Sequence, residues 1–131
     1  MTIRNTDSVP PSKPLRRRLA KGVMVLAAAL CWLNAAIIAT NGVFVATGSQ
    51  AITVSVVVAL LYALIGFVQF KMQHHLFRLW AAPAPGDEGH PAALRSLTFF
   101  SALFSAGIVL VMLLSLSAVL SRITEGYAIF G

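Results

Sequence analysis

The stretch LTFFSALFSAGIVLVMLLSLSAVL, residues 97–120, decides the fold of this chain. Its 24 residues include no charged side chain, and 14 of them are Leu, Ile, Val or Phe. As an α-helix the stretch would be roughly 36 Å long, against a hydrocarbon core of about 30 Å in a bilayer. Its large apolar side chains favour insertion by about 4 to 8 kcal/mol on insertion scales. The stretch is therefore predicted to be a membrane-spanning helix.

The composition of the whole chain indicates an integral membrane protein. Of 131 residues, 58% are hydrophobic and 11% are charged, and the mean hydropathy is +0.83. A soluble domain has about a quarter charged residues and could not bury so much apolar surface. The basic residues behind the net charge of +6 flank the apolar stretches, so no nucleic-acid partner is expected. The single cysteine, Cys31, lies in an apolar stretch and is expected to be a small buried side chain.

Two earlier apolar stretches complete an all-α fold with three transmembrane helices. Asn41-Gly42 is a turn signal, but apolar residues resume behind it, so the first helix is expected to continue past it. The break is expected at residues 47–50. An isolated strand would leave its backbone unpaired in lipid, so the valine-rich second stretch is also predicted to be a helix. The predicted helices cover about residues 22–46, 51–71 and 96–120.

The remaining segments are expected to be two tails and a loop. Residues 1–21 contain prolines and basic residues but little apolar surface, which predicts a disordered basic cytoplasmic tail. A three-helix membrane domain is expected over residues 22–121, with a cytoplasmic loop over 72–95. Residues 122–131 form a short outer tail in this prediction.

Two signals predict how the helices continue outside the hydrocarbon. The segment KMQHHLFRLW, residues 71–80, has apolar side chains at helical spacing and is expected to prolong the second helix. Pro91 suits the first turn of the third helix, where a missing N–H removes no intrahelical hydrogen bond.

The basic residues predict the orientation of the helices in the membrane. With three spans, every Lys and Arg except Arg122 falls on one side. By the positive-inside rule the N-terminus is expected to be cytoplasmic and the C-terminus outside, in a bacterial inner membrane. The cluster before the first helix also suits contacts with anionic lipid headgroups, at about 1 kcal/mol per residue. This cluster consists of Lys13, Arg16, Arg17, Arg18 and Lys21.

The first apolar stretch also fits a second interpretation. A basic cluster, an apolar run and small residues at Ala46 and Gly48 describe a signal peptide cleaved before Ser49. The run LRRRLAK resembles part of a twin-arginine signal, with Arg16 and Arg17 as the pair. No Ser or Thr precedes the pair, and the apolar run is longer than in usual signals. Cleavage would leave a two-helix hairpin that resembles a conjugative pilin in layout.

Few side chains are able to carry chemistry. His74 and His75 are weak candidates for cofactor contact, because they lie past the end of the second span and point about 100° apart on a helix. One chain cannot sandwich a haem between them, which leaves a haem or quinone at an interface shared with another subunit. The acidic residues all lie outside the predicted spans. No catalytic residue and no metal site is predicted, and the chain is not expected to be an enzyme.

Small residues at helical spacing predict the surfaces on which the helices pack. Small side chains let helix backbones approach closely in lipid, where hydrophobicity gives no drive for association. Asn34, in the first span, is expected to hydrogen-bond a neighbouring helix. The small-residue positions are Ala59, Ala63 and Gly66 on the second helix, and Ser101, Ala102, Ser105 and Ala106 on the third.

Three short spans with few polar groups resemble, in layout, small helical subunits of respiratory and photosynthetic membrane complexes. Examples are the anchor subunits of fumarate reductases and subunit IV of quinol oxidases. The resemblance covers the hydropathy pattern and no motif, so no functional residue is carried over. It implies a non-catalytic accessory, assembly or anchor subunit whose partners are other membrane proteins or further copies of itself. The alternatives are a holin-like, homo-oligomeric pore former and a haem- or quinone-contacting anchor.

Overall fold

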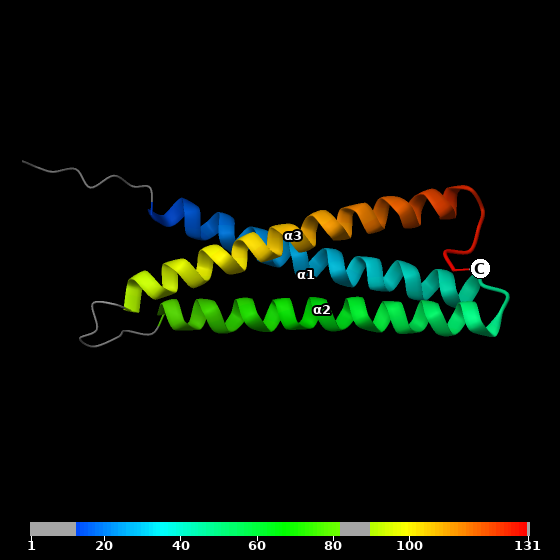
Figure 1. Ribbon diagram of the computed structural model, residues 1–131, viewed down its shortest axis with the longest axis horizontal. Coiled ribbons are helices and arrows are strands. Elements are labelled where there is room, and N and C mark those ends of the chain that lie inside the picture. Colours follow the sequence, from blue (N-terminus) through cyan, green and yellow to red (C-terminus); the bar gives the residue numbers. More distant parts are fainter. Residues whose placement is uncertain (1–12, 82–89, 131) are drawn as a thin grey trace, which may run out of the picture.

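The computed structural model describes residues 13–81 and 90–130, and its regular elements there are three α-helices. Figure 1 shows them side by side, running alternately in opposite directions along one long axis. Each contains at least 30 residues apolar enough to cross a membrane. The expected all-α fold with three helices of membrane-spanning length is confirmed, and it suggests an integral membrane protein. The helices are α1 (Lys13–Phe44), α2 (Ser49–Ala81) and α3 (His90–Thr124).

All three helices are longer than the predicted spans. α1 begins at Lys13, so residues 13–21 are helical, although the sequence placed them in a disordered tail. Adding a turn to an existing helix needs no new nucleus, and the Arg, Leu, Lys and Ala residues of this segment are good helix formers. The predicted extension of the second helix through residues 71–80 is present in α2. The rest of the tail, residues 1–12, and residues 82–89 of the predicted loop lie outside the described residues.

The ends of the helices follow local backbone chemistry. Pro91 lies in the first turn of α3, where it was expected. At the other end of α3, Gly126 adopts a φ of 76°. Its N–H donates to Ile123 O over 3.0 Å, and the N–H of Tyr127 donates to Arg122 O over 3.0 Å. This pair of bonds is a Schellman cap, which stops the helix and turns the chain back.

The C-terminal tail returns to the end of α1. The N–H of Ile129 donates to Asn41 Oδ1 over 3.0 Å. Ile129 and Phe130 also pack against a buried apolar cluster made by Ala35, Ile38, Ala59 and Val119. The tail therefore covers one end of the bundle, at the side of the short α1–α2 connection.

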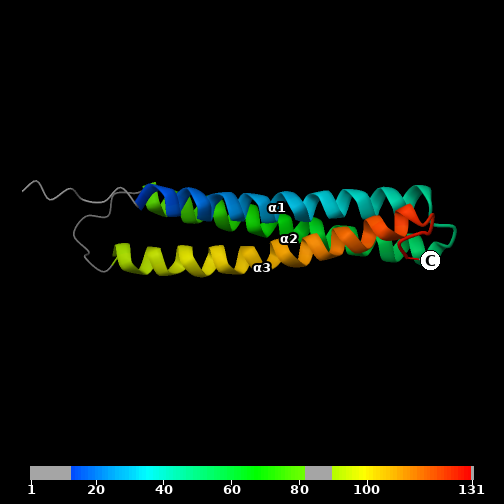
Figure 2. The same cartoon turned by 90° about the horizontal axis from the view of Figure 1, so that it is seen from above.

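α1 is the central helix of the bundle. It packs along both other helices, whereas α2 and α3 approach each other at few points. Figures 1 and 2 show α3 lying across the α1–α2 pair, close to α2 where α3 begins and over α1 where it ends. In the most apolar part of each helix, 44% of the residues of α1 are buried, against 17% for α2 and for α3. Most of the apolar surface of α2 and α3 therefore faces outward.

Candidate functional site

The surfaces through which the helices pack are the candidate site. Where α2 crosses the middle of α1, Gly66 allows the two backbones to approach. A Cβ atom at Gly66 would lie 2.7 Å from Trp32 Nε1 and 3.1 Å from Cys31 Cβ. The indole N–H of Trp32 donates to the carbonyl oxygen of Ala63 over 3.3 Å. A methyl group at position 66 would therefore displace the Trp32 side chain and press on Cys31.

A second close approach lies near the end of α1, at Gly42. A Cβ atom there would overlap the Cβ atom of Ser55, which is almost completely buried. The hydroxyl of Ser55 donates to Ala51 O over 2.8 Å, within its own helix. The first helix was predicted to continue past the Asn41-Gly42 turn signal, but neither Gly42 nor Ser55 was predicted as a packing residue. The four-residue spacing of Ser55, Ala59 and Ala63 was a usable signal.

The small residues predicted on α2 face α1. Ala59 is buried against Ala35 and Ile38 of α1. Gly66 is buried and Ala63 is half-buried. These three positions therefore form one continuous packing surface along α2.

The small residues predicted on α3 separate into two faces. Ser101 and Ser105 are buried, whereas Ala102 is half-buried and Ala106 is exposed. The hydroxyl of Ser105 lies 3.1 Å from Gln69 Oε1 and 2.8 Å from Ser101 O. Its single proton is able to serve one of these two acceptors at a time. The serines thus face the bundle, and Ala106 faces outward.

Asn34 links α1 to α3 in the interior of the bundle. It is fully buried, and its Nδ2 donates to Leu30 O over 2.9 Å and to Met112 O over 3.2 Å. Within the described ranges its Oδ1 has no hydrogen-bond partner, and the same holds for Oε1 of the buried Gln73. The bond to Met112 is the contact with a neighbouring helix that the sequence suggested for Asn34.

Two further hydrogen bonds join α2 to α3, and sequence reasoning did not identify them. The hydroxyls of Tyr62 and Ser115 are 3.1 Å apart. Trp80 Nε1 donates to Thr98 Oγ1 over 2.8 Å, and Thr98 Oγ1 donates to Leu94 O over 2.7 Å. Uncharged polar residues inside apolar stretches were the available signal, since such groups need partners in lipid.

The basic cluster lies at the end of the bundle where α1 begins and α2 ends. The guanidinium of Arg17 lies 5.7 Å from the ring centre of Phe77 and 5.1 Å from that of Trp80. Lys21 Nζ lies 5.7 Å from the Phe77 ring centre. Cation–π attraction therefore ties the start of α1 to the end of α2. Arg16 and Arg18 are exposed, and Lys13 is the first residue of α1.

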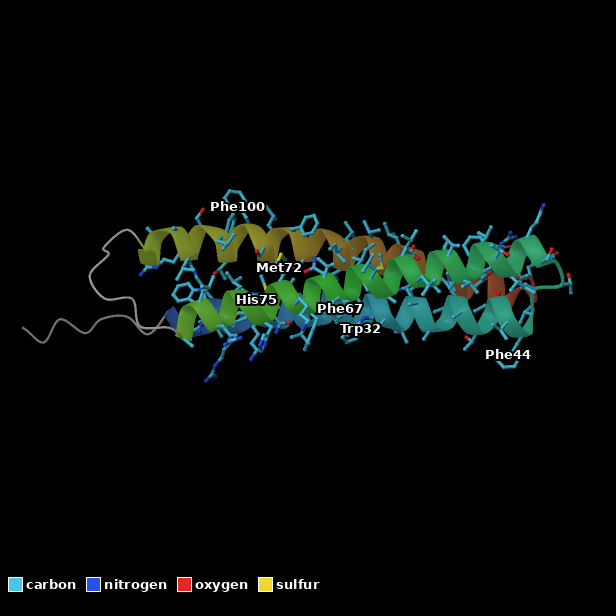
Figure 3. The ribbon with its side chains drawn as sticks, turned by 90° about the horizontal axis from the view of Figure 1, so that it is seen from below. Trp32, Phe44, Phe67, Met72, His75 and Phe100 are labelled. Atoms are coloured by element: carbon cyan, nitrogen blue, oxygen red, sulfur yellow. The ribbon has the colours of Figure 1, made fainter. Side chains whose placement is uncertain are left out.

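The candidate cofactor residues are on the surface of α2. His74 and His75 are both exposed, and their ring centres are 6.2 Å apart. Figure 3 places His75 near the end of α2, past Phe67 and Met72. In the part of the chain that the structure describes, no three His, Cys, Asp or Glu residues are grouped as metal ligands would be. A haem or quinone shared with another subunit stays a prediction.

The chain matches no protein-family model, no curated protein and no solved structure. Its function is therefore inferred from the arrangement of the helices and from the residues on their surfaces.

Proposed function

We propose that this chain is a small, non-catalytic accessory or assembly subunit of a larger complex in a bacterial inner membrane. It acts by packing an outward helix face against transmembrane helices of a partner. The observation that carries this proposal is the outer face of α3, which combines large apolar side chains with an open glycine.

Large side chains surround Gly107 on this face. A Cβ atom at Gly107 would meet no atom of residues 13–81 and 90–130 within 4 Å, so packing within these residues does not require the glycine. Glycine within a helix costs about 1 kcal/mol relative to alanine, and contact with lipid does not offset this cost. A closely packed partner helix does offset it, because its backbone fits into the notch that the missing side chain leaves at Gly107. The surrounding exposed residues are Phe100, Leu103, Phe104, Leu110, Val111 and Leu114, and Figure 3 shows Phe100 on the outer side of α3.

The proposed orientation places the basic end in the cytoplasm. Because the helices alternate in direction, the start of α1, the end of α2 and the start of α3 lie at one end (Figures 1 and 2). Arg17, Arg78 and Arg95 belong to these three segments. Of the described basic residues only Arg122 lies at the opposite end. Accessibility labelling of single cysteines tests this orientation: positions 95 and 127 are expected to react from opposite sides of the membrane.

The central place of α1 supports its retention in the mature protein. Met24, Ala27 and Ile38 of α1 are almost completely buried by the other helices. Removing α1 as a cleaved signal would leave α2 and α3 with few contacts between them. Mass spectrometry of the purified protein is therefore expected to give the mass of a chain that still contains residues 13–44.

Site-specific photocrosslinking tests the partner surface. A photoreactive residue replaces Phe104 on the outer face of α3, and a matched control replaces Leu64, which is similarly exposed on α2. Position 104 is expected to give one adduct to a distinct, larger membrane protein, and position 64 is expected not to. Replacing Gly107 by Leu in the same chain is expected to lower the adduct yield at least fivefold, because the added side chain fills the notch.

Two outcomes would reject the accessory-subunit proposal. An adduct consisting of two copies of this chain would favour the homo-oligomeric, holin-like alternative. Equal labelling of many proteins from positions 104 and 64 would mean that both faces contact only lipid and passing neighbours.

A further inference from the structure

A shallow open groove of about 540 Å³ runs along the outer face of α1 at the basic end of the bundle. Its position does not overlap the proposed partner surface on α3. The residues that line the groove follow one another at the three- and four-residue steps that place side chains on one face of a helix. Within the described residues the groove is lined by Arg18, Lys21, Gly22, Val25, Leu26 and Ala29.

The groove is charged at one end and apolar along the rest of its length. Arg18 and Lys21 lie directly before Gly22, where the uncharged stretch of α1 begins. This boundary sets them at the level of lipid headgroups and sets Val25 and Ala29 within the hydrocarbon. Lys21 Nζ also lies 5.7 Å from the ring centre of Phe77 of α2.

Glycine and alanine keep the floor of this shallow groove free of large side chains, so a chain of methylene groups is able to lie along it. A Cβ atom at Gly22 would meet no atom of the described part of the chain within 4 Å, so no described side chain covers this position. Gly22 and Ala29 are both exposed, two helical turns apart on the same face. Large side chains at these two positions would fill the space that the groove provides.

We propose that this groove binds one phospholipid with an anionic headgroup. The phosphate lies between Arg18 and Lys21, and an acyl chain follows Gly22, Val25 and Ala29 toward the membrane centre. Two cations at headgroup level favour phosphate, and the apolar floor favours hydrocarbon. The proposal concerns a bound lipid, distinct from the general attraction of a basic segment to an anionic membrane surface.

Charge argues against a second copy of this chain as the occupant. Two copies with the same membrane orientation would bring Arg18 and Lys21 of one α1 against the same residues of the other. Like charges directly opposite one another oppose association. An anionic lipid instead neutralises these side chains.

A second groove at the same end of the bundle provides a control. It has a volume of about 550 Å³ and is lined by His75, Arg78, Leu79 and Ala81 of α2. It lies beyond Lys71, which ends the uncharged stretch of α2, so no wall of this groove reaches into the hydrocarbon. Removing the charge of Arg78 therefore changes the net charge of this end without changing the α1 groove.

Native mass spectrometry of the full purified chain tests the proposal. The probes are phosphatidylglycerol, phosphatidylcholine and glycerol phosphate, each added to the protein in detergent. The fraction of protein that retains one phosphatidylglycerol is expected to be at least fivefold larger than the fraction that retains phosphatidylcholine. Soluble glycerol phosphate is expected not to compete at the same concentration, because it lacks the acyl chain.

Matched variants locate the bound lipid. Arg18→Gln combined with Lys21→Gln, and separately Gly22→Leu, are each expected to lower retention of phosphatidylglycerol at least fivefold. The controls Arg78→Gln and Gly107→Leu are expected to change it less than twofold. Gly107 is an open glycine on α3 and so matches Gly22 in its tolerance for a larger side chain. Ala29→Leu fills the same groove and is used if Gly22→Leu lowers the helix content measured by circular dichroism.

Three results would overturn the proposal. Equal retention of phosphatidylcholine would show that the headgroup charge is not recognised. An equal loss with Arg78→Gln would show that only the net charge of this end matters. Unchanged retention in both Gly22→Leu and Ala29→Leu would show that no acyl chain occupies the groove.

Discussion

The interface of α1 with α2 differs in kind from the attachment of α3. Between α1 and α2, Gly42 and Gly66 bring the backbones together, and the neighbouring helix occupies the space of the missing side chains. Within the described residues α3 has no such glycine contact: it packs on α1 through the larger apolar side chains of Met112 and Val119. It also accepts hydrogen bonds from side chains such as those of Asn34 and Trp80. In lipid, close packing requires matched shapes, whereas a single interhelical hydrogen bond contributes on average about 0.6 kcal/mol.

This difference predicts unequal rigidity within one bundle. A close backbone contact fixes both the distance and the register of two helices, because neither is able to move without a steric clash or a void. Hydrogen bonds between side chains tolerate small shifts, since rotamers adjust. The α1–α2 pair is therefore expected to be the stable frame, and α3 the helix that adapts its position. Because α3 carries the proposed partner surface, this freedom would let it adjust its position when a partner helix binds.

The largest effect is expected at Gly42. Gly42→Ala places a methyl group on the Cβ atom of Ser55, which moves only with the α2 backbone. Overpacking of this kind costs about 1–3 kcal/mol, and the upper end is expected here. Steric trapping in bicelles measures the resulting loss in the free energy of unfolding.

The paired variant Ser55→Gly provides the control for Gly42→Ala. It removes the atoms with which the new methyl group clashes, so the double variant is expected to recover at least half of the lost stability. If Gly42→Ala alone left stability unchanged, α1 and α2 would not be in close contact at this point. Gly107→Ala is the reference for the change in helix propensity: its Cβ meets no atom of the described residues within 4 Å, so it is expected to raise stability by up to about 1 kcal/mol.

A smaller effect is expected at Gly66. Here the nearest atoms to an added methyl group are Nε1 and Cδ1 of Trp32, at 2.7 and 2.8 Å. The Trp32 side chain is 43% exposed and has room to turn outward, at the expense of its hydrogen bond to Ala63 O. Gly66→Ala is therefore expected to cost about 1 kcal/mol, in the lower part of the overpacking range. The tryptophan emission spectrum is expected to change in Gly66→Ala, because Trp32 moves and loses its hydrogen bond. An unchanged spectrum would mean that Trp32 keeps its place.

The attachment of α3 is tested by the pair formed by Trp80 and Thr98. Trp80→Phe removes the N–H donor, and Thr98→Val removes the acceptor and the bond to Leu94 O. A double-mutant cycle is expected to give a coupling of about 0.6 kcal/mol and at most about 1.7 kcal/mol. Additive losses would mean that the two side chains do not interact in the bilayer. Tyr62→Phe with Ser115→Ala is a second, independent cycle on the same interface.

The sequence predicted the fold better than it predicted the contacts. Three uncharged stretches of sufficient length determine three helices, because no other structure satisfies the backbone in lipid. Pairing is determined by shape on one face of each helix, and a list of small residues does not say which face meets which neighbour. Ala102 and Ala106 follow the same spacing as Ser101 and Ser105, yet only the serines are well buried.

Gly42 shows why one of the closest contacts was missed. Asn-Gly is a strong turn signal in soluble proteins, so the dipeptide was weighed only as a turn that the first helix overrides and not as a packing position. In α1 both residues are helical and buried, and the glycine receives Ser55 of α2 while Asn41 accepts from Ile129. The same dipeptide thus serves packing and not chain reversal, and only the position of α2 and of the C-terminal tail reveals it.

The smallest effect is expected at Asn34, although this side chain is fully buried. Asn34→Leu removes the hydrogen bond to Met112 O, but it also removes Oδ1, a buried acceptor with no partner in the described part of the chain. A lost interhelical bond costs about 0.6 kcal/mol, and removing an unsatisfied buried group returns a similar amount. The free energy of unfolding is therefore expected to change by less than about 0.5 kcal/mol.

A loss above about 2 kcal/mol in Asn34→Leu would contradict this balance and would mean that Oδ1 accepts a hydrogen bond, as from a buried water. Asn34→Asp tests the role of the acceptor. In hydrocarbon its carboxyl group is neutral, so one oxygen accepts and the O–H donates to one of the carbonyl oxygens of Leu30 and Met112. If Oδ1 of Asn34 accepts a hydrogen bond, the stability of Asn34→Asp is expected to be closer to that of the unaltered chain than to that of Asn34→Leu.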